Sequence, residues 1–481
     1  MVSLKYSLTY LSHEWGNMKN DNGQLFFSAT DLANHLACQH ATILEVQRTN
    51  GLATKQYRQD PTLELLIELG NRHEQAYCDF LVADGKDVLQ LPEFGSQNLE
   101  DGIQAMNAGR EIIAQAWLQN GQWRGRSDFL VKVDRPSNFG DWSYEVADTK
   151  LSRTTKTTAI LQLCLYSEIL AEIQGVLPEF IHVVKPSTDS ANPFEVDSHR
   201  LSEYMAYYRQ AKSNFEATVA DGPHQSSYPE PCNHCQICDW WTVCNQKRRE
   251  DDHLSFVAGM TKSQRQEMSE HQVVTLEGFA NAAQAHPGFP KRGALGSYVK
   301  SQLQAKIQLK GKQTGRPEFE FNEIEKDRGF LRLPEPSSAD VFFDIEGNPR
   351  ASDNGLEYLL GYVDDSAQNP YLAKWGLSRS DEKVSFELFI DEMMQRYQAD
   401  PAMHIYHYAP YEPAAMKRLA TRHATREVEL DHLLRGKVFV DLYGITRQAI
   451  RASIESYSIK QLEQFYGYER LEVLELSLIH I

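Results

Sequence analysis

Apolar and polar residues alternate along two neighbouring segments, 126–133 and 142–151, in the way that is typical of β-strands. A loop containing Pro136 and Gly140 separates them. The residues that follow repeat their apolar positions at helical spacing through Leu161 and Tyr166. This order of strand, loop, strand and helix predicts an α/β core.

Helical spacing also marks two earlier segments. Residues 25–38 read as a short strand followed by a helix that is capped at Ser28 or Thr30, and residues 63–82 read as a longer helix. We expect residues 1–24 to form an N-terminal tail, with Met18 as an alternative start of the protein.

A second α/β domain is predicted at 339–475. It opens on an apolar segment, 340–349, that we read as a buried strand, and further strands are expected at 356–363, 404–408 and 437–443. Between the two domains we expect a helical segment, 251–288, that is either a helix-hairpin-helix element or a plain spacer. A basic linker, 289–338, follows and ends in a proline-rich joint.

Composition limits the function classes. A chain of 481 residues suggests two or three domains. The net charge of −17 argues against charge-driven binding of nucleic acid over the whole surface, but a few basic residues suffice for a local site. Seven basic residues and no acidic one occur from 291 to 316, which is either such a site or a solvated linker or helix face: Lys291, Arg292, Lys300, Lys306, Lys310, Lys312 and Arg316. No stretch approaches the roughly 18 apolar residues of a membrane span, so we expect a cytoplasmic protein without a membrane partner.

Paired carboxylates mark a first candidate site. Asp148 and Lys150 lie two residues apart on a predicted strand and therefore share one face. Asp128 lies on the neighbouring strand, so the two acids could hold a divalent metal for phosphodiester hydrolysis, with Lys150 beside it. Gln162 and Tyr166 share one face of the following helix.

A second carboxylate pair, Asp344 and Glu346, shares one face of the strand that opens the second domain. Two metal ions held by acids at such a strand are typical of RNase H-like exonucleases. Residues 407–412 resemble the second motif of the DEDD exonucleases, although His407 replaces the usual Asn and Glu412 replaces the usual Asp. Asp441 and residues 457–467 look like the region before the third motif, whose last Asp is missing.

Taken together, the first set of motifs resembles the RecB-type nuclease module of the PD-(D/E)XK class, which also occurs in CRISPR-associated RecB-like exonucleases. The resemblance rests on Gly70-x-x-His73-Glu74, Gly125-x-x-Asp128, Asp148-x-Lys150 and Gln162-x-x-x-Tyr166, and covers residues 25–250. It implies that His73, Asp128 and Asp148 bind Mg²⁺ or Mn²⁺, with help from the Thr149 carbonyl. It further implies that Lys150 is catalytic and that Gln162 and Tyr166 shape the site. In the second domain, the resemblance to RNase H-like exonucleases implies a metal site at Asp344, Glu346 and Glu412.

Cysteines crowd the end of the first domain at Cys232, Cys235, Cys238 and Cys244. In a reducing compartment this crowding favours a metal or cluster site over disulfides. In iron–sulfur nucleases of the resembling family, one cysteine before the core joins three after it, which implies a 4Fe-4S cluster held by Cys38, Cys235, Cys238 and Cys244. Cys232 is a rival fourth ligand, and Zn²⁺ is the alternative metal.

The leading hypothesis is a metal-dependent DNA nuclease, an exonuclease on single strands or ends, that acts in DNA repair, recombination or defence. One alternative is a non-catalytic nucleic-acid-binding scaffold, and another is an exonuclease that works through its RNase H-like domain. Residues 476–481 have the sequence that a transposase mosaic end of sequencing libraries encodes, so we expect an adapter-derived tail on a truncated chain that has lost a helicase partner domain. A natural apolar tail is the other interpretation.

Overall fold

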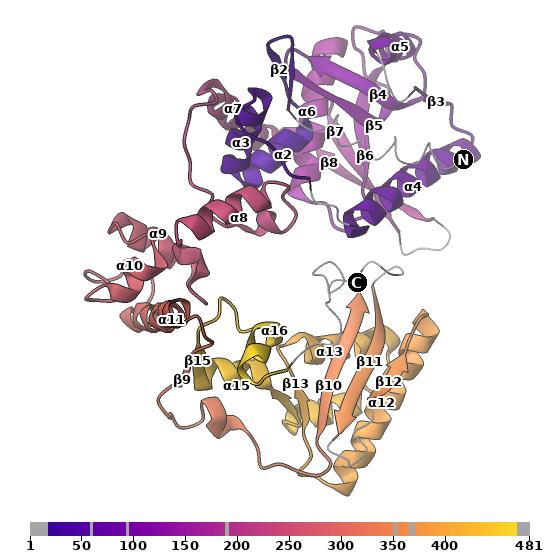
Figure 1. Cartoon of the computed structure of the whole chain (residues 1–481). Coiled ribbons are helices and arrows are strands. Elements are labelled where there is room, and N and C mark those ends of the chain that lie inside the picture. Colours follow the sequence, from indigo (N-terminus) through magenta and orange to yellow (C-terminus); the bar gives the residue numbers. More distant parts are fainter. Residues whose placement is uncertain are drawn as a thin grey trace, which may run out of the picture. The chain divides into compact units, whose positions relative to one another are not determined.

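The computed structural model describes residues 18–57, 61–92, 96–187, 192–349, 351, 355–364 and 371–468. The chain divides into two compact units, Met1–Lys247 and Arg248–Ile481 (Figure 1). Each unit has its own sheet and its own apolar core, which confirms the mixed α/β class. The predicted tail at 476–481 lies outside the described residues. None of the described helices is long and apolar enough to cross a membrane.

The N-terminal unit is built on a six-stranded sheet of order β3-β4-β5-β6-β7-β8. Its strands are β3 (Val88–Gln90), β4 (Ile112–Asn120), β5 (Trp123–Val133), β6 (Ser143–Thr149), β7 (Phe180–Pro186) and β8 (Phe194–Arg200). Strands β4, β5 and β6 form an antiparallel meander, and β6 pairs in parallel with β7. A parallel neighbour needs a crossover, and helix α6 (Thr157–Gln174) provides it.

Helices cover both faces of this sheet. The remaining helices of the unit are α2 (Ala29–Ala37), α3 (Gln39–Thr49), α4 (Pro61–Ala83), α5 (Ser96–Asn107), α7 (Met205–Ala220) and α8 (Trp241–Glu250), with short 3₁₀ turns η1 (Leu201–Glu203) and η2 (Asn233–Gln236). Leu130 and Val146 pack with α2, α6 and α7 in the larger core. Phe129 and Ala147 point the other way and pack against α4. The period-two alternation of the strands therefore assigns each residue to one layer.

The predicted elements around the first site are confirmed, although their ends shift. Ser28 caps α2, and its hydroxyl accepts a hydrogen bond from the Asp31 backbone while Asp31 bonds back to Ser28. The expected N-terminal tail is corrected in part, because β1 (Lys19–Asp21) and β2 (Gln24–Phe26) form a hairpin and Met18 is fully buried. Each strand of this hairpin has only three residues, too few for alternation to stand out in the sequence.

A five-stranded sheet of order β12-β11-β10-β13-β14 forms the core of the C-terminal unit. Its strands are β10 (Val341–Asn348), β11 (Leu356–Asp364), β12 (Leu372–Trp375), β13 (Ile405–His407) and β14 (Phe439–Asp441). Helices α12 (Arg379–Ala399), α13 (Tyr411–His423) and α14 (Glu427–Arg435) supply the apolar side chains that pack on it. Strand β10 was expected to be fully buried, but only alternate residues are buried, and Phe342, Asp344 and Glu346 are exposed.

The segment before this sheet is helical and carries a third apolar cluster. It contains η3 (Leu254–Phe256), α9 (Lys262–Glu270), α10 (Leu276–Asn281) and α11 (Leu295–Thr314), and the unit is completed by β9 (Phe319–Phe321), η4 (Gly329–Arg332), α15 (Leu442–Ala449), β15 (Ile450–Ala452), α16 (Ile459–Leu462) and η5 (Glu463–Phe465). The two short helices expected within 251–288 are present. The expected linker at 289–338 instead contains the 20-residue helix α11, followed by β9 and η4. Its buried side includes Gln302, Gln304 and Gln308, and these polar residues hide the helical periodicity from a reading of the sequence.

Candidate active sites

Two strands and one helix bring the first set of predicted residues together. Asp128 on β5 has the same parity as Leu130, and Asp148 on β6 has the same parity as Val146, so both acids face the α6 layer. Gln162 on α6 donates a hydrogen bond from Nε2 to Asp148 Oδ1 at 3.0 Å. The structure therefore brings these side chains together, as the sequence predicts.

Asp128 is held by the next strand. Its Oδ2 accepts hydrogen bonds from the Thr149 backbone N–H at 2.7 Å and from Thr149 Oγ1 at 2.8 Å. Both donors come from one residue of β6, so they fix the Asp128 carboxylate relative to Asp148. Thr149 is thus a positioning residue that the sequence suggested only for its carbonyl.

Lys150 supplies a positive charge directly beside Asp148. Its ammonium forms an ion pair with Oδ2 of Asp148, a residue with no exposed surface. Burial and the nearby charge of Asp128 raise the pKa of Asp148, and Lys150 opposes the rise. Burial by itself would lower the pKa of Lys150, but the carboxylates of Asp148 and Asp128 outweigh it and raise that pKa. The ammonium therefore stays charged beside the acids.

Tyr166 closes the site from α6, four residues after Gln162, and is buried. A Cβ atom on Gly125 of β5 would lie 2.5 Å from Cε1 of the Tyr166 ring. Real Cβ contacts are longer, so the glycine in this position makes room for the ring. This gives a physical reason for the Gly125-x-x-Asp128 spacing.

Helix α4 contributes His73 and Glu74. Burial and the charge of Asp128 raise the pKa of Glu74 to about 8, so this acid lies within electrostatic reach of the site. The sequence motif contains Glu74, but the residue was not assigned a role. The His73 ring lies with its centroid 5.4 Å from that of Phe194, and Nε2 is 3.5 Å from the Val184 carbonyl oxygen. Burial lowers the pKa of His73, which favours a neutral imidazole that can act as a metal ligand.

The donor set of this site fits Mg²⁺ or Mn²⁺. Asp148 Oδ2 is buried and has no hydrogen-bond partner of good geometry within the described residues, although Lys150 lies close to it. Over the described part of the chain, no three His, Cys, Asp or Glu side chains converge as a ready metal group. Mg²⁺ keeps several waters and is usually bound through one or two carboxylates and substrate phosphates. Two carboxylates are therefore compatible with this ion without a preformed cage.

Cysteines from both ends of the N-terminal unit share one apolar cluster, although no three of them converge as a metal group within the described residues. Cys38, at the junction of α2 and α3, belongs to the same apolar cluster as Cys238 and Cys244. Cys232 and Cys235 are neighbours, with their sulfur atoms 3.9 Å apart. Burial, with added repulsion from the nearby Cys38 and Cys235 sulfurs, raises the pKa of Cys238 to about 11. The structure thus brings Cys38 to the C-terminal cysteines and also leaves Cys232 beside Cys235.

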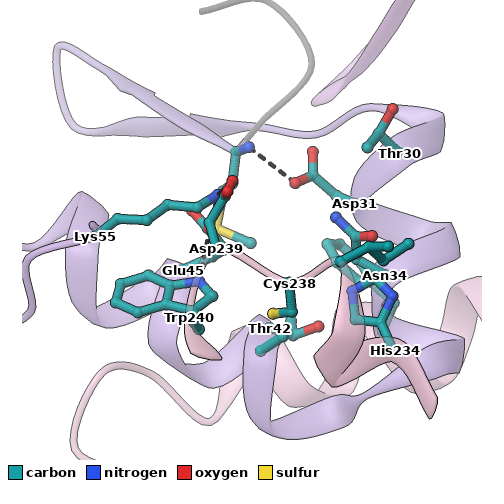
Figure 2. A pocket seen from close by; sticks show the side chains of 14 residues that line it. Thr30, Asp31, Asn34, Thr42, Glu45, Lys55, His234, Cys238, Asp239 and Trp240 are labelled. Atoms are coloured by element: carbon teal, nitrogen blue, oxygen red, sulfur yellow. Dashed lines mark hydrogen bonds and ion pairs between the residues drawn. The ribbon is translucent and has the colours of Figure 1, made fainter. Parts of the chain in front are cut away.

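A cavity of about 200 Å³ adjoins this cluster. In Figure 2, Cys238 lies next to Thr42, with the Trp240 indole on one side and His234 on the other. Glu45 of α3 accepts hydrogen bonds from Trp240 Nε1 at 2.9 Å and Lys55 Nζ at 2.8 Å. These bonds attach the cysteine-rich segment to α3 independently of any metal.

Three acids gather in the C-terminal unit. Asp344 and Glu346 project from one face of β10, and Glu412 lies in the first turn of α13. Partial desolvation and the charge of Glu412 raise the pKa of Asp344. Desolvation and the charge of Asp344 raise the pKa of Glu346, while Lys460 opposes the rise. The three acids are therefore close enough to repel one another, although they do not converge as a preformed metal group within the described residues.

Glu412 is buried and its Oε2 lacks a hydrogen-bond partner within the described residues. The closest imidazole nitrogen, His407 Nδ1, lies 3.4 Å away, but it already bonds to the Ala409 carbonyl oxygen at 2.7 Å. A buried carboxylate oxygen without a donor, beside two further acids, fits a divalent cation. His407 thus takes the position next to the acid where the resembling motif has Asn.

Tyr371 is a residue of this centre that the sequence did not indicate. Gly361 of β11 lies directly opposite Asp344, and a Cβ atom on it would lie 1.9 Å from Tyr371 Oη. The phenol therefore lies over Gly361, on the face of the sheet that carries Asp344. Tyr371 follows a segment with no strand pattern, so only the cross-strand register could have found it.

Residues 341–476 match the family model of the RNase_H superfamily. The match starts at β10 and includes Asp344, Glu346 and Glu412, so the C-terminal unit contains an RNase H-like domain. A search of the curated proteins finds no match to the chain. Domains of the RNase H superfamily are usually metal-dependent nucleases, and this is the chemistry for which three clustered acids are suited.

Proposed function

We propose that this protein is a metal-dependent nuclease that hydrolyses phosphodiester bonds of DNA, at single strands or ends, in the carboxylate–lysine centre of its N-terminal unit. The observation that carries the proposal is the convergence of Asp128, Asp148 and Lys150, with Asp148 fully buried and held by Gln162. A buried acid against a second acid raises the free energy of the folded protein. Such an arrangement is typical of sites where function requires it.

In this proposal Asp128 and Asp148 hold Mg²⁺ or Mn²⁺, with His73 as a further ligand. The ion supplies a Lewis acid for the phosphoryl oxygen and lowers the pKa of water. Thr149 and Gln162 keep the two carboxylates in place through the hydrogen bonds described above. Lys150, whose ammonium stays charged, stabilises negative charge that grows on the phosphate and orients the attacking water. Tyr166 excludes solvent from the α6 side.

We also propose that Cys38, Cys235, Cys238 and Cys244 hold an iron–sulfur cluster of the 4Fe-4S type, with Zn²⁺ as the alternative. The support is the shared apolar cluster of Cys38, Cys238 and Cys244 and the repulsion of Cys235 on Cys238. Cys232 remains a possible fourth ligand, because it lies against Cys235.

The RNase H-like domain is a second candidate for the chemistry. The observation that favours it is the unpartnered Oε2 of buried Glu412 beside Asp344 and Glu346. In this case the N-terminal unit binds the nucleic acid and the C-terminal unit cleaves it.

One experiment separates the two candidates. The full chain, purified without oxygen, is assayed with Mn²⁺ or Mg²⁺ on end-labelled single-stranded and duplex DNA. Asp148→Asn should reduce cleavage by about 100-fold or more, as the loss of a group that stabilises the transition state does. The matched variant Asp344→Asn should leave cleavage within about twofold of wild type. The reverse result would move the chemistry to the RNase H-like domain, and full activity in both variants would reject nuclease function at either site.

A further inference from the structure

The C-terminal unit contains a groove of about 1230 Å³ that takes part of its lining from the basic segment 291–316. Its walls come from the loops before α9 and α11, from α11 itself, from β9 and the loop after it, and from α15 and β15. The lining residues that carry the argument are Arg292, Lys300, Phe321, Tyr443, Arg447 and Tyr457.

The balance of charge in the groove is positive. It is lined by five basic residues and three acids: Arg292, Lys300, Arg328, Arg447, Arg451, Glu320, Glu323 and Glu325. Arg451 pairs with Glu320, and Arg328 pairs with Glu325 at 2.9 Å. Arg292, Lys300 and Arg447 form no ion pair within the described residues, and Glu323 is the acid that remains against them. In a chain of net charge −17, such a local excess of cations is a distinguishing feature.

Other members of the basic segment do not contribute. Lys312 pairs with Asp252, Lys310 with Glu318 at 2.7 Å, and Lys291 with Glu270. Three of the seven basic residues of 291–316 are therefore used in ion pairs within the fold, and two others, Arg292 and Lys300, line the groove. Lys300 belongs to the second group, while Lys306 of the same helix is exposed but does not line the groove.

Aromatic and small residues complete the lining. Phe321 is 69% exposed although it lies at the groove, and Tyr443 lies on the α15 side. Gly259, Gly293 and Gly296 leave backbone accessible there. Cations that track phosphates and aromatic rings that stack on bases are the combination that binds single strands without sequence preference.

The groove is connected to the RNase H-like acids by a short segment. Tyr457 lines the groove. Lys460, three residues later, is close enough to Glu346 for its charge to lower the pKa of that acid. On the other side, the Tyr443 backbone N–H donates to Asp441 Oδ1, which also accepts from the backbone of Ala409 next to β13. The groove thus adjoins the carboxyl ends of the central strands, where the acids are.

We propose that this groove binds the phosphate backbone of a single nucleic-acid strand, through Arg292, Lys300 and Arg447 and by stacking on Phe321, and holds the strand beside the RNase H-like acids. The inference rests on the proposed function of the chain as a nuclease and names the place where its C-terminal unit holds the substrate.

The test measures binding in EDTA, where no cleavage occurs, from the anisotropy of a labelled oligo-dT strand. The double variant Lys300→Glu/Arg447→Glu should bind about tenfold more weakly, and its salt dependence should fall by a slope of about one to two between about 50 and 200 mM salt. Lys306→Glu and Lys417→Glu make the same charge reversal outside the groove and should bind as wild type does.

If the double variant binds the strand as well as the two controls do, the proposal that the groove binds nucleic acid is wrong. It is also wrong if the wild-type protein binds no strand. Preference for a duplex of the same length would overturn the assignment to single strands. Asp148→Asn and Asp344→Asn should bind the strand normally in EDTA, so the cleavage rates of these two variants, measured with metal, test the nuclease proposal separately. If the groove variants bind normally while Asp148→Asn still abolishes cleavage, the groove proposal is rejected and the nuclease proposal stands.

Discussion

The two acidic centres differ in how the protein holds their carboxylates. In the N-terminal unit, Asp148 has no exposed surface, and hydrogen bonds from Gln162 and Thr149 fix it and its partner Asp128. In the C-terminal unit, Asp344 and Glu346 stand on the exposed face of β10. The first centre is already arranged by the protein, while the second consists of acids that repel one another.

The positive charge differs as well. Lys150 forms an ion pair with Asp148. Within the described residues Lys460 forms no ion pair with Glu346, and its charge only lowers the pKa of that acid from a distance. A centre whose ammonium is already in place can stabilise negative charge on a bound phosphate without rearrangement of the protein. The comparison therefore favours the N-terminal unit for chemistry and the C-terminal unit, with its cationic groove, for holding the strand.

The largest expected effect comes from the two lysines. Lys150→Ala should reduce DNA cleavage by about 100-fold or more, because it removes the charge that faces the phosphate. Lys460→Ala should change cleavage by less than about threefold. The measurement is the single-turnover rate with Mn²⁺ for both variants, with circular dichroism as the control for folding. Equal losses would show that the two centres act as one, and a larger loss for Lys460→Ala would reverse the comparison.

The cysteines give the next largest effect, and it should be confined to the N-terminal unit. Cys38 is nearly two hundred positions upstream of Cys235, so a cluster that joins them closes a very long loop. By the chain-entropy argument for cross-links, loss of such a loop closure costs about 5 kcal/mol. Cys38→Ser should therefore lose its iron and melt earlier, and Cys232→Ser should retain both metal and stability.

Iron and zinc per chain, measured beside the melting temperature, decide this. Loss of metal in Cys232→Ser with retention in Cys38→Ser would mean that the cluster is local to residues 232–244. Zinc without iron in protein purified without oxygen would keep the link to Cys38 and change the metal.

Two glycines test how tightly each centre is packed. A Cβ atom at Gly125 would lie 2.5 Å from the ring of Tyr166, which is 6% exposed and has nowhere to move. Gly125→Ala should cost about 1–3 kcal/mol of unfolding free energy, as overpacking does. At Gly361 the clash is with Tyr371, which is 58% exposed and can turn into solvent. Gly361→Ala should cost less than about 1 kcal/mol.

Urea denaturation of both variants measures these costs. Tyr166→Leu combined with Gly125→Ala should recover part of the loss, because the clashing ring is gone. If Gly361→Ala is the more damaging variant, the second centre is as closely packed as the first, and the contrast between them is wrong.

Much of the first site could be predicted because its signal is local. The two strands and the helix each carry their own periodicity, and parity along the strands fixes which side chains share a face. What could not be predicted depends on distant partners. Glu74 reaches the site from α4, and Tyr371 lies over Gly361 only because of the register between strands.

The helix α11 was missed for a different reason. Its buried glutamines bond to backbone carbonyls, as Gln308 does to Phe256 at 2.7 Å and Gln304 to Ala452 at 2.9 Å. Polar residues that are buried in this way look like surface residues in the sequence. The groove depends on α11, so the sequence could indicate the basic residues of 291–316 as a candidate nucleic-acid site but not the walls that surround them.

The smallest expected effect is a difference in pH dependence between one buried acid of each unit, both outside the acidic centres. Burial raises the pKa of Asp31 from 3.8 to about 6, against the hydrogen bonds that it accepts from Ser28 and Met18. The folded state then binds the proton more tightly than the unfolded state, so Asp31 makes the protein less stable as pH rises from about 4 to 6.

Glu382 behaves in the opposite way. Burial would raise its pKa, but bonds from the Glu357 backbone, Arg379 and other partners outweigh it and lower the pKa below 4.5. Its contribution is present above the unfolded pKa and is lost as pH falls through the folded one.

Asp31→Asn should therefore reduce the loss of stability of the N-terminal unit between about pH 4 and 6, by at most the slope that one bound proton contributes. Glu382→Gln should lower the stability of the C-terminal unit at pH 7 and lower it much less in acid. Hydrogen exchange reports the two units separately because each has its own core amides. Protection measured at several pH values from 4 to 7 is thus the suitable measurement. A slope in the N-terminal unit that persists unchanged in Asp31→Asn would assign the pH dependence to other groups. A Glu382→Gln variant that loses as much stability in acid as at neutral pH would show that packing, rather than the charge of Glu382, holds α12 in place.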